Sequence, residues 1–230
     1  MTTNDPNLLV ESAQFAYLAT RFHRDGYLHL PQVLSAEELA ALQRDSGRII
    51  DGGWRGVDPQ SDAFHDILAD TGEDVFHRVQ YVFPKVHENS FLILLAQPFL
   101  LGLIEHLVGP DFLCGAEALV FKAPRNGREV PVHTDCDLKD RRLGPLIFNV
   151  DYYLDDSSLE NGCLYIAPGS HNAPIWDVAA LGFDYPGLVP LPARAGDVVI
   201  HNVRTVHGSH RSRGTAARAV LRVSIAESDR

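Results

Sequence analysis

The spacing of apolar residues along the chain predicts helices in its first part. Apolar residues recur every three or four positions over residues 8–22, as they do along one face of a helix, and Gly26 follows as a stop signal. Ser35 and Glu38 then form the S-x-x-E capping pattern, in which the two side chains satisfy free N–H groups at a helix start. A second helix is therefore expected to run from there to about residue 50, after an extended segment over residues 27–34.

The next segments predict one more helix and one long loop. Residues 91–108 look like a third helical stretch, which Gly109-Pro110 ends. Residues 51–74 are rich in Gly and Asp and show no clear period. This composition predicts a surface loop or a lid over residues 51–74.

From residue 113 onward the period of the apolar residues changes to two. Short β-rich runs separated by polar turns are expected at 113–122, 130–135, 146–154, 163–167, 197–201 and 218–226. Such spacing is typical of a sandwich or barrel. We find no internal repeat, low-complexity tract or linker, so we expect one mainly β unit with flanking helices (α+β) over residues 1–230. In this unit a helical part of about residues 1–110 would pack on a barrel of about residues 111–230.

The composition is that of an ordinary folded protein. Hydrophobic residues make up 45% of the 230 positions and charged residues 22%, which provides for a sizeable core and excludes a disordered chain. The formal net charge of −10 repels nucleic-acid phosphates and anionic lipid headgroups. We therefore expect neither nucleic acid nor a membrane surface as a partner, and the oligomeric state stays open.

The sequence shows no targeting or membrane-spanning pattern. The longest apolar stretch, residues 91–96, is stopped by Gln97 and Pro98, and residues 1–15 lack the basic and apolar regions of a signal peptide. The cysteines are odd in number and widely spaced: Cys114, Cys136 and Cys163. These features predict a cytoplasmic protein.

Eleven histidines are many for this length, and histidine together with aspartate provides the usual ligands of a non-haem iron site. The His-x-Asp triplet occurs twice, at residues 23–25 and 133–135, and about one is expected by chance. His23 lies at the end of a predicted helix, where positions i and i+2 point in different directions. His133 and Asp135 lie on a predicted strand, where such positions share a face. The second triplet is therefore the candidate chelate.

A 2-His-1-carboxylate site needs one more histidine, and the downstream candidates are His171, His201, His207 and His210. If the open iron positions take a 2-oxo acid and dioxygen, an arginine must hold the acid's far carboxylate. Among the histidines only His207 has an arginine eleven residues later, Arg218, beyond a turn signal. Arg218 lies on the polar face of the last predicted strand, as a residue inside a polar barrel would. His207 is therefore favoured, and we expect His201 and His210 to be packing or surface residues.

Four segments stand out together: FHRDGYLHLPQVLSAEEL (22–39), VPVHTD (130–135), ENGCLYIAPGSH (160–171) and HGSHRSRGTAARAVL (207–221). With these segments in this order, nearly the whole chain resembles the phytanoyl-CoA dioxygenase family of iron(II)- and 2-oxoglutarate-dependent oxygenases. The resemblance implies a double-stranded β-helix, a jelly-roll or cupin-like barrel of two antiparallel sheets with helices outside.

The resemblance also implies roles for the site residues. His133, Asp135 and His207 would bind the catalytic iron. A second group of residues would form the co-substrate site. Arg218 and Ser209 would bind the distal carboxylate of 2-oxoglutarate, and Arg78 would be a further basic contact. Thr134, which lies between His133 and Asp135 in the sequence, completes this group.

Two polar residues of the expected strand 146–154 are candidate substrate contacts. Alternation places Asn149 and Asp151 on one face of this strand. If that face looks into the barrel, both residues would contact substrate or co-substrate. Asp151 would then form a salt bridge with a cationic substrate or pair with Arg222.

The resemblance implies an iron(II)- and 2-oxoglutarate-dependent dioxygenase that uses O2, with hydroxylation of a small molecule in a biosynthetic pathway as the expected reaction. The alternative is a cupin-like metal-binding barrel that acts as an isomerase or binding module without redox chemistry. The chain lacks the His-x-His opening expected of such cupins, and this alternative gives no role to Arg218.

Overall fold

The computed structural model describes residues 6–52, 63–67, 71–82, 90–125, 127–136, 146–173 and 178–228. Its helices are α1 (Pro6–Asp25), α2 (Ala36–Asp51), α4 (Ser90–Leu95), α5 (Pro98–Val108) and α6 (Val178–Leu181), with 3-10 turns η2 (Ser170–Asn172) and η3 (Gly182–Asp184). The first six strands are β1 (Tyr27–Leu30), β2 (Ala63–Ile67), β3 (Asp74–Gln80), β4 (Phe112–Lys122), β5 (Val130–His133) and β6 (Ile147–Tyr153). The remaining strands are β7 (Leu164–Ile166), β8 (Val189–Leu191), β9 (Val198–Asn202), β10 (His207–Ser209) and β11 (Arg218–Glu227).

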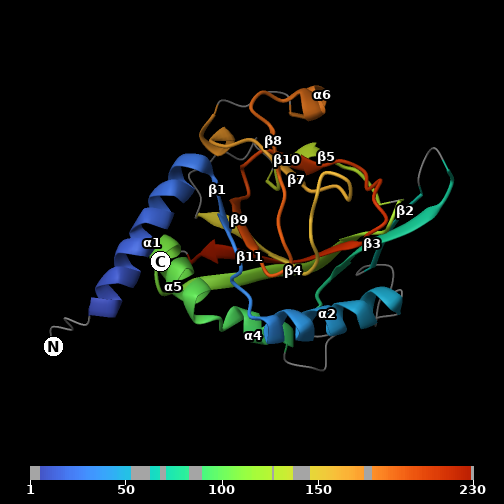
Figure 1. Ribbon diagram of the computed structural model, residues 1–230. Helices are drawn as coiled ribbons and strands as arrows, with labels where there is room; N and C mark the ends of the chain where they lie inside the picture. Colours follow the sequence, from blue (N-terminus) through green and yellow to red (C-terminus); the bar gives the residue numbers. More distant parts are fainter. Residues whose placement is uncertain are drawn as a thin grey trace.

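The strands form two antiparallel sheets. The larger sheet has the order β1-β9-β6-β11-β4-β3-β2, and the smaller has the order β5-β10-β7-β8. The two sheets face each other, with the helices outside them (Figure 1). This arrangement is the double-stranded β-helix that the family resemblance implied.

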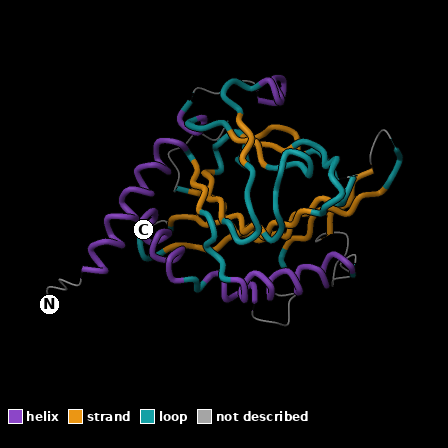
Figure 2. Tube along the Cα trace, viewed as in Figure 1, coloured by secondary structure: helices purple, strands orange, loops and turns teal. Residues whose placement is uncertain are grey.

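The larger sheet has an apolar outer face and a polar inner face. Leu221 and Val223 of β11 belong to one buried cluster with residues of α1, α2, α4 and α5, and Figure 2 shows these helices gathered along one side of the strands. Val220 instead packs with Ile166 of the smaller sheet. Because side chains alternate along a strand, Arg218 and the other residues in step with Val220 face the space between the sheets.

Local signals set the helix boundaries. The predicted capping box at Ser35 and Glu38 is present at the start of α2. The predicted helix over residues 91–108 is in fact two helices, because the Gln97 side chain accepts a hydrogen bond from the N–H of Leu100 and Pro98 opens α5. Both features are characteristic of a new helix start.

Two expectations about the first part of the chain were wrong. Residues 51–74 are not all loop, because β2 lies within them and pairs with β3; residues 53–62 and 68–70 lie outside the described part. The first part is also not only helical, since β3 pairs with β4. In contrast, β1, which pairs with β9, lies within the extended segment expected over residues 27–34. The two consecutive polar residues His77 and Arg78 interrupt the apolar alternation of β3, so the sequence pattern did not predict this strand. No helix among the described residues is long and apolar enough to cross a membrane.

Candidate active site

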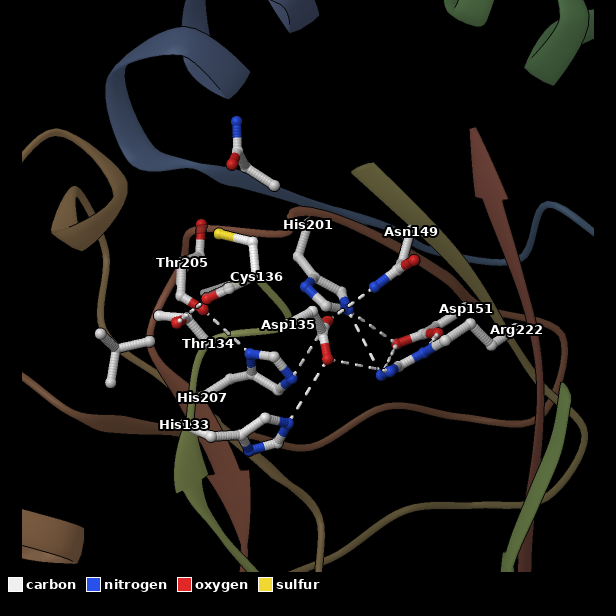
Figure 3. Close-up of polar contacts among 12 residues, drawn as sticks. His133, Thr134, Asp135, Cys136, Asn149, Asp151, His201, Thr205, His207 and Arg222 are labelled. Carbon is white, nitrogen blue, oxygen red and sulfur yellow. Dashed lines mark hydrogen bonds and ion pairs between the residues drawn. The ribbon is translucent and has the colours of Figure 1, made fainter. Parts of the chain in front are cut away.

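Three side chains converge between the sheets: His133, Asp135 and His207. His133 ends β5 and His207 begins β10, and the two residues are direct partners in the antiparallel ladder. The Nε2 atoms of His133 and His207 lie 3.4 and 3.6 Å from the two carboxylate oxygens of Asp135. One potential ligand atom from each residue lies within 4.8 Å of the other two, and Figure 3 shows the three side chains directed toward one another.

Backbone carbonyls fix the tautomer of both histidines. Nδ1 of His133 lies 2.7 Å from the carbonyl oxygen of Pro131, and Nδ1 of His207 lies 2.9 Å from that of Thr205. A carbonyl only accepts hydrogen bonds, so each Nδ1 carries the proton. In the neutral rings this leaves the lone pair on Nε2, which is directed at Asp135. Such second hydrogen bonds orient metal-binding histidines in proteins.

The charges in this group favour the forms that bind a cation. Burial, together with the neighbouring His201, lowers the pKa of His207 to about 3, so its ring is neutral at pH 7. Burial alone would raise the pKa of Asp135, but the contact with His133 and the charge of Arg222 together lower it below its usual range. At pH 7 the group therefore offers neutral imidazole and a carboxylate.

These three residues fit an iron(II) ion. Nε2 of His207 is buried and has no hydrogen-bond partner among the described residues. The distances of 3.4 and 3.6 Å from the histidines to Asp135 are too long for good hydrogen bonds. They suit two ligands of one cation, because bonds of about 2.1 Å at right angles place ligand atoms about 3 Å apart and wider angles place them farther. Two histidines and one carboxylate with open positions form the donor set of non-haem iron(II) oxygenases.

The other His-x-Asp triplet is arranged differently. His23 lies on the exposed end of α1, and the carboxylate of Asp25 pairs with Arg24 at 2.7 Å. Within the described residues, the only cluster of three or more potential ligands is that of His133, Asp135 and His207.

A buried arginine marks a second part of the site, farther along β11. Arg218 is only 5% exposed and shares the inner face of the sheet with Arg222, four residues or about 13 Å along the strand. Burial lowers the pKa of Arg218. Its Nε has no hydrogen-bond partner, and no ion pair links it to a carboxylate in the described chain. A buried guanidinium in this state offers a binding position for an anion.

The remaining co-substrate candidates lie on three different segments of the chain. Ser209 is buried on β10, two residues beyond His207 and on the same side of the strand. Arg78 lies on β3, with its guanidinium 3.9 Å above the ring of Phe64. The Thr134 hydroxyl donates to the carbonyl of Cys136 at 3.0 Å.

The two candidate substrate contacts, Asn149 and Asp151, lie on the inner face of β6. Asn149 donates a 2.7 Å hydrogen bond to Asp135. Asp151 is paired with Arg222, at 2.8 Å from Nε to Oδ1. Of the two arrangements that the sequence left open for Asp151, the structure has the pairing with Arg222.

Three residues in the interior were not recognised as part of the site. His201 is fully buried, with its ring centroid 4.6 Å from that of His207. Arg222 lies 3.6 Å from the carboxylate of Asp135. Lys122 is the strand partner of Arg218 and is 2% exposed. The alternation of the last strand placed Arg222 on the polar face, but His201 and Lys122 carried no comparable signal.

The chain is similar to known proteins over most of its length. A family described as phytanoyl-CoA dioxygenase (PhyH) matches residues 22–220 of this chain. The chain is also similar to a probable alpha-ketoglutarate-dependent hypophosphite dioxygenase of Stutzerimonas stutzeri. The two are 25% identical over 234 residues, which cover 94% of this chain and 79% of that protein.

Two solved structures resemble the chain over most of its length. EvdMO1 superposes with a TM-score of 0.79 and 28% identity, over 94% of this chain and 50% of EvdMO1, so the present chain spans half of that one. AviO1 from Streptomyces viridochromogenes Tue57 superposes with a TM-score of 0.73 and 31% identity, over 92% of this chain and 94% of AviO1.

Proposed function

Because the chain belongs to the phytanoyl-CoA dioxygenase family, we propose that His133, Asp135 and His207 hold the iron of an iron(II)- and 2-oxoglutarate-dependent dioxygenase. The family has this activity, and the chain is an enzyme of this class. The observation that carries the residue assignment is the convergence of two Nε2 lone pairs on one carboxylate, with both Nδ1 atoms donating to carbonyls.

Arg218 and Ser209 hold the far carboxylate of 2-oxoglutarate in this proposal. Arg218 has a buried guanidinium without an anionic partner in the described chain, and Ser209 lies on the facing sheet beyond His207. The two ends of a dicarboxylate would then be bound at two separate places, at the metal and at the arginine. Arg78 and Thr134 are kept as secondary candidates for the co-substrate site.

When bound, iron supplies the activation of dioxygen that couples the oxidation of 2-oxoglutarate to succinate and CO2 with the oxidation of a C–H bond. For a hydroxylation the balance is R–H + 2-oxoglutarate + O2 → R–OH + succinate + CO2. The protein's own contribution is to orient the groups that bind. The carbonyls of Pro131 and Thr205 hold the two imidazoles in the metal-binding tautomer. Arg218 fixes the direction of the co-substrate.

The substrate in this proposal is a small organic molecule, and hydroxylation is the outcome. The site lies between the two sheets, a concave position that suits a small molecule. The complete His-Asp-His group disfavours halogenation, because the carboxylate occupies the metal position that a halide would need. The alternative of a metal-binding barrel without redox chemistry leaves the unpaired charge of Arg218 unexplained.

The test is co-substrate turnover by the purified protein. Iron(II), 2-oxoglutarate and oxygen should yield succinate slowly without a substrate, and a panel of small molecules should reveal one that accelerates it. Asp135→Ala should abolish succinate formation, whereas the distant His23→Ala should leave it unchanged. Iron-independent turnover, or full turnover in Asp135→Ala, would overturn the assignment.

A further inference from the structure

We propose that Asn149 and Arg222, the latter held by Asp151, are positioning residues that fix the carboxylate of Asp135 in the orientation required by the metal. This inference rests on the proposed iron site and gives Asn149 and Asp151 a role other than substrate contact. We call the five residues involved the Asp135 support cluster: Asn149, Asp151, His201, Arg222 and Ser224. All five belong to the larger sheet, whereas the two proposed histidine ligands belong to the smaller one.

The backbone alone does not orient the Asp135 side chain. Asp135 lies two residues beyond the end of β5, outside the ladder that aligns His133 with His207. Its N–H donates a hydrogen bond to the carbonyl of Val203 at 2.8 Å, and the described part of the chain shows no other backbone hydrogen bond of Asp135. The direction of the carboxylate must therefore come from its side-chain contacts.

The first contact of the Asp135 carboxylate is with Asn149 of β6, which is itself held by Ser224 of β11. Ser224 donates to the side-chain oxygen of Asn149 at 2.7 Å, and the Asn149 amide nitrogen donates to Oδ2 of Asp135 at 2.7 Å. Because a carboxylate only accepts hydrogen bonds, Asp135 must face the nitrogen of the Asn149 amide, and the Ser224 hydroxyl holds the oxygen end. Asn149 is 2% exposed, so water competes little for this hydrogen bond.

The second contact reaches the other oxygen of the carboxylate. Nη1 of Arg222 lies 3.6 Å from Oδ1 of Asp135. Arg222 is aligned by Asp151, its direct strand partner, with Nε to Oδ1 at 2.8 Å and Nη2 to Oδ2 at 3.4 Å. His201, which is fully buried, contacts the same Oδ2 of Asp151 at 3.3 Å. Figure 3 shows this chain of contacts running from Asp151 and Arg222 to Asp135.

These contacts explain why Asp151 is not available to a substrate. Its side chain is 4% exposed, and both of its oxygens already contact Arg222 or His201. Each oxygen of Asp135, in contrast, faces one proposed histidine ligand and one member of the support cluster. Outer residues that hydrogen-bond a metal ligand typically contribute about 10- to 100-fold to metal affinity.

The experiment is a titration of the metal-free full-length protein with Co(II), whose visible absorption reports ligand geometry. The central variant is the double substitution Arg222→Met/Asp151→Leu, which removes the ion pair without leaving one buried charge alone. We expect about 10- to 100-fold weaker Co(II) binding and a changed absorption band, with the melting temperature retained. Asn149→Leu, which keeps the side-chain shape, should shift affinity and spectrum in the same direction.

Asp197→Asn is the matched control. Asp197 is a buried carboxylate just before β9 of the larger sheet and contacts His29 instead of the proposed metal ligands, so its variant should keep wild-type Co(II) affinity and spectrum. Wild-type affinity and spectrum in the double variant would overturn the inference. So would a loss of 2-oxoglutarate affinity with unchanged Co(II) binding, because Arg222 would then be a co-substrate contact. Failure of the wild-type protein to bind Co(II) through His207 would instead overturn the proposed function.

Discussion

Replacing Arg218 by methionine should weaken the binding of 2-oxoglutarate without lowering the stability of the protein. Arg218 is 5% exposed, and its guanidinium has no ion-pair partner in the described chain. Burying such a charge costs free energy, and burial accordingly lowers the pKa of Arg218. Methionine keeps a flexible apolar side chain in the same place without the charge. The metal-free variant should therefore melt no lower than the wild type.

Arg218→Met should, in contrast, greatly weaken the binding of 2-oxoglutarate. Without the arginine, the far carboxylate of 2-oxoglutarate would enter the space between the sheets unpaired. Removing one partner of a buried ion pair costs about 3–5 kcal/mol. Because each 1.4 kcal/mol is tenfold, the dissociation constant should rise by a factor of roughly a hundred to a few thousand. Iron affinity should stay within a fewfold, since Arg218 lies about 13 Å along β11 from Arg222, which contacts Asp135.

Isothermal titration of the anaerobic, iron-loaded protein with 2-oxoglutarate measures this directly. Arg213→Met is the control, because Arg213 is exposed in the turn just before β11 and the same chemical change there should leave the affinity unaltered. An unchanged affinity in Arg218→Met would refute the reasoning. A clear fall in its melting temperature would refute the premise that the buried charge is unpaired before the co-substrate binds.

Three further outcomes follow from the site. In Asp135→Ala, iron(II) binding measured without oxygen should weaken at least tenfold because two neutral imidazoles lack the charge-neutralising ligand, and equal binding in wild type and variant would contradict the ligand assignment. Ser209→Ala should weaken 2-oxoglutarate binding about tenfold in the same titration, the size of one hydrogen bond to a charged group, and no change would remove Ser209 from the co-substrate site. Burial and the charge of Arg218 lower the pKa of Lys122 from 10.5 to about 7, so between these pH values the unfolded state binds more protons. The stability of the wild type relative to Lys122→Met, measured by urea unfolding, should therefore rise between pH 7 and 10 by up to about 1.4 kcal/mol per pH unit; a difference independent of pH would show that the lysine keeps its ordinary pKa.

Patterns local in the sequence predicted most of the fold. The period-two alternation of β11 placed Arg218 and Arg222 on one face, and the same rule put His133 on a strand. The rule was wrong in placing Asp135 on that strand as well, because β5 ends at His133. The prediction failed where the determining contacts are long-range. Lys122 precedes a Pro-Gly loop and looks solvated in the sequence, but its ammonium donates to the carbonyls of Ser209 and His210, almost ninety positions later.

The support of Asp135 was hidden for the same reason. Asn149 and Asp151 were recognised as inward-facing residues, but alternation says nothing about how far a side chain reaches. Whether they meet a substrate or Asp135 depends on the distance between the sheets, which the apolar contact of Val220 with Ile166 helps to set. The helices fix the larger sheet from behind through Leu221 and its neighbours. The geometry of the site thus depends on the packing of the two sheets as much as on the residues that line it.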